Sequence, residues 1–156
     1  MKEEVYNYLR EYGFTKEEVY SFEEENEKMF FTNLIEVNKN IDFLINKGLN
    51  KEEVMHVFRK NPFMITVKNN RLNALDKIYL EELLFTEEEL KKIINDNPET
   101  YTESPIELEK IIDRMKKLNC SIKTIKEIFL ENPKILDMTI NEFDNIVKFI
   151  KGEYYG

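Results

Sequence analysis

The sequence predicts an all-α protein, an α-solenoid of about four helix-pair repeats of about 35 residues with proline breaks. The first observation is that the pattern of Leu49–Thr66 recurs along the chain. Its copies lie at 14–31, 85–102 and 120–137, the first being the weakest. The second observation is the spacing of Pro62, Pro98 and Pro133, which stand 36 and 35 residues apart. A fixed period of this length is typical of stacked helical units, each of which buries its apolar face against its neighbours.

The composition is that of one soluble domain. The chain has 156 residues, of which 42% are hydrophobic, enough for one continuous core. The net charge of -8 disfavours non-specific attraction to polyanions. No apolar run approaches the roughly 20 residues that span a bilayer, and the charged N-terminal segment lacks the apolar stretch of a signal peptide. We therefore expect a cytoplasmic protein with no membrane contact.

Four equivalent positions carry residues that start helices: Thr15, Asn50, Thr86 and Ser121. The side-chain oxygen of such a residue accepts a hydrogen bond from a backbone N–H of the first turn. Glu18 and Glu89 follow three residues after Thr15 and Thr86, which predicts complete capping boxes in the first and third copies. Apolar residues flank every cap at the spacing of a hydrophobic staple. The pairs are Phe14 with Val19, Leu49 with Val54, Phe85 with Leu90, and Cys120 with Ile125.

The residue before each staple has to end the preceding helix. Gly13 and Gly48 suit that position, because glycine adopts the left-handed conformation without steric cost. The equivalent residues in the later copies are Leu84 and Asn119. Asparagine tolerates the left-handed conformation and leucine does not, so we expect a different helix ending at Leu84.

The second helix of each pair is expected to end at an asparagine. Asn-Pro dipeptides stand at 61–62, 97–98 and 132–133. Proline lacks an N–H and restricts the residue before it, which ends the helix. The first copy has Asn26 followed by Glu27, so its helix is expected to continue or to bend differently. Three residues after the breaks are expected to be buried on a short helical turn: Ile65, Tyr101 and Leu136.

The first helix of each pair carries two apolar columns. One column is Val37, Leu72, Leu108 and Phe143, and the other is Leu9, Leu44, Tyr79, Met115 and Ile150. The predicted helices span about 2–12, 33–47, 69–83, 104–118 and 139–151. We therefore divide the single domain 1–156 into repeats at about 2–32, 33–68, 69–103 and 104–138, followed by a capping helix at 139–151.

Helix pairs with an Asn-Pro break at this period resemble the mitochondrial transcription termination factor (mTERF) family. The resemblance is carried by GLNKEEVMHVFRKNPFMIT, LFTEEELKKIINDNPETYT and NCSIKTIKEIFLENPKILD. It implies units of two antiparallel helices plus a short third helix, stacked into a curved half-ring. It also implies nucleic-acid binding along a basic groove.

Residues that would support catalysis are scarce. The single histidine, His56, lies off the apolar columns and is expected at the surface. The single cysteine, Cys120, occupies a staple position and is expected to be a small buried apolar group. No Cys/His pair has the spacing of metal ligands, and no glycine-rich phosphate loop is present. We therefore predict a protein that is not an enzyme and needs no metal or cofactor.

The charges are unevenly distributed. Basic residues around the second break form a candidate nucleic-acid contact, in which Phe63 would stack on a base. Its residues are Arg59, Lys60, Phe63, Lys68 and Arg71. Acidic runs in the first and third units form a candidate surface for a basic partner: Glu23, Glu24, Glu25, Glu87 and Glu88. The acidic third unit interrupts the continuous basic stripe that a duplex would require.

Three functional hypotheses follow. The leading one is a non-catalytic module that binds another protein through its acidic surface. The alternative is a small mTERF-like regulator that binds DNA or RNA through the basic second repeat. The third is a mimic of nucleic acid that occupies the basic groove of a nucleic-acid-binding enzyme and inhibits it.

Overall fold

A computed structural model describes the backbone of residues 1–132 and 140–155, and the side chains of 1–132 and 141–149. Every regular element in these ranges is helical, which confirms the all-α prediction. The longer helices are α1 (Glu3–Tyr12), α2 (Lys16–Glu25), α3 (Leu34–Asn46), α4 (Lys51–Lys60), α6 (Asn69–Lys77), α7 (Glu87–Asp96), α8 (Pro105–Lys117), α9 (Ile122–Glu131) and α10 (Ile140–Tyr155). The short ones are η1 (Glu27–Phe30), α5 (Phe63–Thr66), η2 (Ile78–Glu82) and η3 (Pro98–Tyr101).

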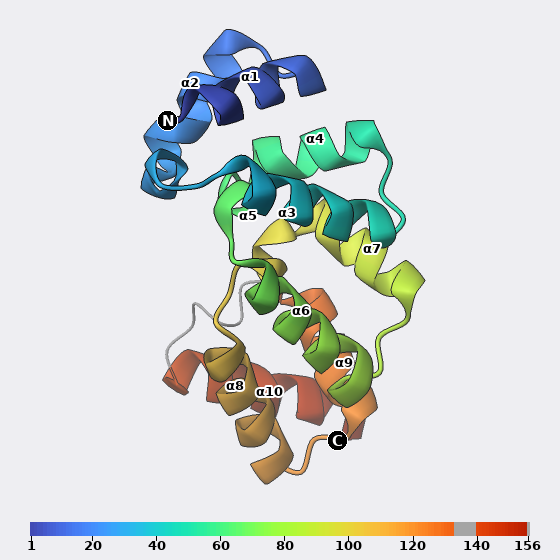
Figure 1. The fold of residues 1–156 in the computed structure, drawn as a ribbon. Coiled ribbons are helices and arrows are strands. Elements are labelled where there is room, and N and C mark those ends of the chain that lie inside the picture. The colour runs from blue at the N-terminus through green and yellow to red at the C-terminus, as the bar shows by residue number, and fades with distance from the viewer. Residues whose placement is uncertain (133–139, 156) are drawn as a thin grey trace.

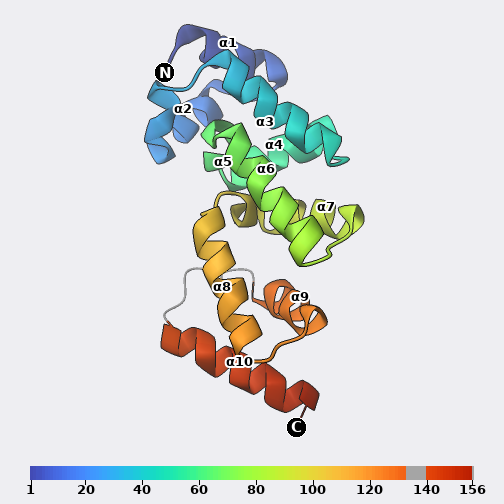
Figure 2. The same ribbon diagram turned by 60° about the horizontal axis from the view of Figure 1, so that its bottom comes forward.

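The helices form an elongated stack with α1 at one end and α10 at the other (Figure 1). Helix α3 packs on α1 and α6, and α6 packs on α8, so these helices form one row. Helix α4 packs on α7 in a second row. The helices α3, α6 and α8 all begin on the same side of the stack, where α5 also lies (Figure 2). This arrangement confirms the predicted helical-repeat solenoid.

The boundaries of the units remain our proposed division. Each proposed boundary falls between a short helix and the long helix that follows it. These gaps lie between η1 and α3, between α5 and α6, and between η3 and α8. The end of the fourth unit lies outside the described residues.

One apolar core runs through the stack. The predicted columns of the first row are buried at Leu9, Val37, Leu44, Leu72, Tyr79, Leu108, Met115 and Phe143. The staple residues are buried as well, including Cys120, while His56 is exposed as predicted. Ile65 and Tyr101 are fully buried anchors. Leu136 and the side chain of Ile150 lie outside the described residues.

The predicted helix starts are confirmed. Thr15 and Thr86 form capping boxes with Glu18 and Glu89. Asn50 forms a third complete box with Glu53, in a copy for which only the cap residue was predicted. Ser121 accepts from the N–H of the residue three positions later. Each such cap stabilises its helix by about 1 kcal/mol.

The expectation of a different helix ending at Leu84 is confirmed, although Leu84 itself takes the left-handed conformation that a leucine was not expected to adopt. Leu84 does adopt the left-handed conformation, with φ of 56°, as Asn119 does with φ of 63°. What differs is the helix before it, whose last turn, η2, is a π-helix. The N–H of Phe85 donates to the carbonyl of Tyr79, six residues back, whereas Leu49 donates to Leu44, five residues back. A π-turn accommodates one extra residue, which explains why the spacing here is 36 and not 35.

Asparagine ends the second helix with or without proline. Asn26 stands at the same position as Asn61 and ends α2 although Glu27 follows it. The amide of Asn26 donates to Thr66 Oγ1 at 2.8 Å and to the Pro62 carbonyl at 3.1 Å, both in the next unit. The expectation of a different path in the first copy is therefore wrong. In the first copy, which has no proline, the side chain of Asn26 ties the break to the next unit through these hydrogen bonds.

Candidate nucleic-acid interface

Two of the predicted basic contacts link neighbouring units. The guanidinium of Arg59 pairs with Glu18 and lies over the ring of Phe14. The ammonium of Lys60 donates to the backbone carbonyl of Asp96. These contacts join α4 to α2 on one side and to α7 on the other. Arg59 and Lys60 thus form contacts between neighbouring units. Neither residue lines the pocket, described below, that contains the other three predicted residues.

The capping-box glutamates take part in the same links between units. Glu18 accepts from Arg59, Glu53 accepts from Asn95 at 2.8 Å, and Glu89 accepts from Lys126 at 3.0 Å. Each glutamate therefore caps its own helix and anchors the next unit. The hydrogen bond from Arg59 is the main cause that lowers the pKa of Glu18. Backbone hydrogen bonds within the boxes are the main causes that lower the pKa values of Glu53 and Glu89.

The remaining three predicted residues, Phe63, Lys68 and Arg71, line one pocket together with Lys28 from η1. We call it the cationic pocket; its volume is about 280 Å³. Its other lining residues are Thr66, Val67, Asn70 and Thr102. The lining thus holds three cations and no carboxylate. That composition suits a phosphate group, which both lysine and arginine bind well.

Arg71 is held rigidly at this pocket. Its Nε donates to the Glu103 carbonyl at 2.9 Å, and its Nη2 donates to the Thr102 carbonyl at 2.9 Å. The carbonyls of Thr102 and Glu103 lie in the loop between η3 and α8. Asn61 also fixes this loop, because its amide donates to Thr102 Oγ1 at 3.1 Å. A guanidinium carries five N–H donors, so these two bonds orient it and leave others for a ligand. The loop between η3 and α8 thereby fixes Arg71, a residue of the third unit, at a pocket that it shares with residues of the first and second units.

A second polar cavity carries charges of both signs. It lies between α3 and α6, is lined by Lys39 and Lys47 as well as by Asp42, Asp76 and Glu87, and has a volume of about 480 Å³. The buried ammonium of Lys47 pairs with Asp76 at 2.7 Å and with Glu87 at 2.8 Å. The hydroxyl of Tyr101 also donates to Asp76, at 2.9 Å. The cationic pocket is therefore a local feature with carboxylates beyond it.

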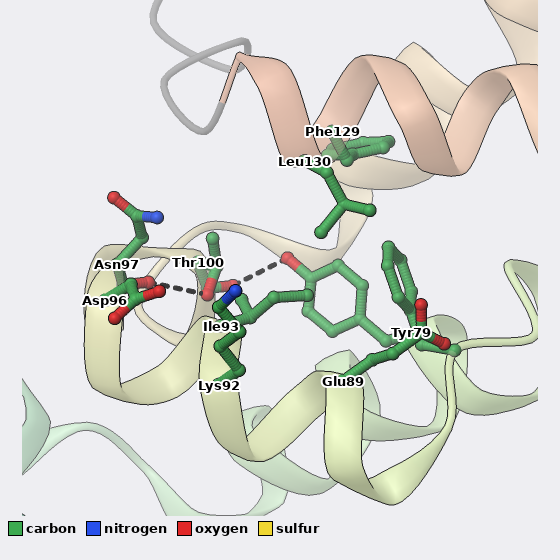
Figure 3. A pocket seen from close by; sticks show the side chains of 10 residues that line it. Tyr79, Glu89, Lys92, Ile93, Asp96, Asn97, Thr100, Phe129 and Leu130 are labelled. Carbon is green, nitrogen blue, oxygen red and sulfur yellow. Dashed lines mark hydrogen bonds between the residues drawn. The ribbon is translucent and has the colours of Figure 1, made fainter.

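A further cavity, of about 420 Å³, lies between α7, η3 and α9 (Figure 3). Its buried polar groups already have partners. The hydroxyl of Tyr79 donates to the Thr100 carbonyl at 2.7 Å, and Thr100 Oγ1 donates to the Asn97 carbonyl at 2.8 Å. Burial raises the pKa of Tyr79, so this phenol stays protonated. The lining also includes Glu89, Lys92 and Asp96, of which Glu89 pairs with Lys126 at 3.0 Å.

Comparison with known proteins supports the interpretation of the fold. The mTERF family model matches residues 1–100, which include the first two units and the four cationic or aromatic residues of the pocket. The chain belongs to the mTERF family. No curated protein matches it. Within the described residues, no helix has the length and apolarity needed to cross a bilayer, and no group of three or more His, Cys, Asp or Glu side chains is placed to hold a metal ion.

The predicted acidic surface of this mTERF protein is only partly available to a partner. Glu23 pairs with the N-terminal amine at 2.9 Å, and Glu87 pairs with Lys47. Glu24, Glu25 and Glu88 are exposed. The two acidic runs lie on α2 and at the start of α7, which belong to different units.

Sequence reasoning missed Lys28 as a pocket residue. It lies 35 residues before Phe63, in a copy that lacks the proline, and so it carried no motif of its own. The register of the repeat could have found it, because that register places η1 beside α5 in the next unit. The linking role of the capping glutamates was also missed, although Arg59 and Lys126 follow Glu18 and Glu89 by about one repeat.

Proposed function

We propose that this mTERF-family chain is a non-catalytic regulator that binds nucleic acid through the cationic pocket. The observation that carries the proposal is the convergence of Lys28, Lys68 and Arg71 around Phe63, with no carboxylate in the lining. Family membership supports the same function. This reverses the order of the two leading hypotheses from the sequence, because a net charge of -8 hides a local cationic site.

The electrostatic geometry supports a short contact. Three cations neutralise about three phosphates, which predicts a slope of log affinity against log salt of about -2 for a single strand. The first-row helices begin on this side of the stack, so the positive ends of their dipoles face it (Figure 2). Binding is therefore expected to be moderate and strongly dependent on salt.

Fluorescence anisotropy with labelled 20-residue RNA and DNA, at 50 to 200 mM salt, tests the proposal. The double variant Lys28→Gln/Lys68→Gln should bind much more weakly and should reduce the salt slope to about -0.7, the value for Arg71 alone. The matched control is Lys117→Gln/Lys123→Gln, which removes two exposed lysines from α8 and α9. Absence of binding at 50 mM salt, or equal losses in the two double variants, would refute the proposal.

A protein partner is the second candidate function. The observation that favours it is the exposure of Glu24 and Glu25 on α2 and of Glu88 on α7. A pull-down from native lysate after nuclease treatment tests it. A basic protein retained by the wild-type chain and lost with Glu24→Gln/Glu25→Gln would support this function. Retention that disappears on nuclease treatment would assign the contact to nucleic acid instead.

A further inference from the structure

We propose that the cationic pocket takes unpaired nucleotides, with phosphates on its cations and bases stacked on its exposed phenylalanines. This inference rests on the proposed nucleic-acid binding and specifies the form of the ligand. It commits to single strands, RNA or DNA, as opposed to a duplex.

One exposed aromatic ring lines the pocket, and a second lies at the end of the short helix that carries Lys28. Phe63 is the first residue of α5, lines the pocket, and is 48% exposed. Phe31 is 82% exposed and directly follows η1. Its N–H donates to the Lys28 carbonyl at 3.0 Å, so the two residues are joined by a 3₁₀ turn. In that geometry residues three apart project from the same face, which places Phe31 on the face of η1 that carries Lys28.

This juxtaposition is the combination that single-strand binding requires. Unpaired bases stack on aromatic rings irrespective of sequence, while cations follow the phosphates. The volume of about 280 Å³ lies just below the range of about 300–1,000 Å³ typical of small-molecule sites, which favours one nucleotide over a larger cofactor.

A duplex fits this site poorly. Its bases are stacked on one another and cannot reach Phe31 or Phe63 without unpairing. Its phosphates recur along the whole axis, about one charge per 1.7 Å, and require cations over several units. The neighbouring cavity between α3 and α6 carries charges of both signs: Lys39 and Lys47 line it beside Asp42, Asp76 and Glu87, and Lys47 pairs with Asp76 and Glu87. The three cations of the cationic pocket therefore do not continue as a purely basic stripe into this cavity, and a short unpaired segment at the pocket requires no such stripe.

The test measures anisotropy for four labelled 12-residue probes: single-stranded RNA, single-stranded DNA, the corresponding DNA duplex, and an abasic strand with the same phosphates. Both single strands should bind more tightly than the duplex and the abasic strand. Phe31→Ala and Phe63→Ala should each weaken single-strand binding by roughly 5- to 150-fold and leave abasic binding unchanged. Phe149→Ala is the matched control, because Phe149 is 73% exposed on α10. Circular dichroism establishes that each variant is folded.

The outcomes separate the two proposals. A duplex or abasic strand that binds as tightly as the single strands would overturn the inference on unpaired bases. So would phenylalanine variants that behave like Phe149→Ala. In either case a loss caused by Lys28→Gln/Lys68→Gln would still support nucleic-acid binding. Absence of binding to all four probes would overturn both proposals.

Discussion

Replacing Asn26 by alanine should separate the first unit from the second. The Asn26 side chain is fully buried and donates to Thr66 Oγ1 and to the Pro62 carbonyl, and it accepts from the N–H of Lys28 at 3.2 Å. A neutral hydrogen bond contributes about 1 kcal/mol net, and a buried carbonyl left without a donor costs about 1–3 kcal/mol. We therefore expect Asn26→Ala to lower the free energy of unfolding by about 2–4 kcal/mol. Thr66→Val loses only one of these bonds and should cost about 1 kcal/mol.

Urea unfolding followed by circular dichroism at 222 nm measures this effect. A linear array loses cooperativity when one interface weakens, so the slope of the transition should also fall. Hydrogen exchange should show the loss of protection concentrated in α1 and α2. Asn7→Ala is the control: Asn7 is exposed on α1, and alanine there should be neutral or stabilising by at most about 0.7 kcal/mol. A change below about 0.5 kcal/mol for Asn26→Ala would show that the amide does not hold the break.

Three further predictions concern stability. Leu84→Gly should raise the free energy of unfolding by about 0.5–1 kcal/mol in thermal melts, because Leu84 is strained at φ of 56° and its side chain is 60% exposed. The control Asn119→Gly should change the free energy of unfolding by only a few tenths of a kcal/mol. Equal effects of the two substitutions would contradict the strain at Leu84. A hydrogen bond with Glu82 is the main cause that raises the pKa of Glu109 to about 7, so the associated stability is complete below pH 4.5 and is lost as pH rises through 7. Glu109→Gln should therefore raise the melting temperature relative to wild type at pH 8 and not at pH 4.5; an identical difference at both pH values would refute this. The backbone hydrogen bond from Asn50 is the main cause that lowers the pKa of Glu53. Glu53→Ala should therefore lower the free energy of unfolding by about 1 kcal/mol at pH 7 and by less as the pH falls below 4.5. A loss of stability that stays constant with pH would contradict this prediction.

Much of the fold was predictable because each unit repeats its local signals. The N-caps, the staples and the apolar columns depend on residues a few positions apart, and four copies confirm one another. The failures involve single positions at which packing overrides propensity. Leucine at the left-handed position is one, since its conformation follows from the π-turn before it. Asn26 is another, because its partners lie 36 and 40 residues away.

The candidate site was less predictable, because charge alone does not say where a cation points. Arg59 and Lys60 lie in the last turn of α4, and their side chains contact Glu18 and Asp96 of the neighbouring units. Lys68 and Arg71 lie only a few residues further on, yet they reach the cationic pocket. Which cations face solvent depends on the register between neighbouring units, and a single sequence motif does not contain that information. Whether the pocket residues contact nucleic acid remains a prediction.

The π-turn at η2 has a consequence for how such arrays change length. The extra residue is confined to the corner between Tyr79 and Phe85, and the caps on either side of it keep their usual geometry. An insertion there is thus isolated from the rest of the molecule. The outer corner of a helix pair is accordingly a site at which evolution, or a protein engineer, can add a residue without disturbing the alignment of the neighbouring modules.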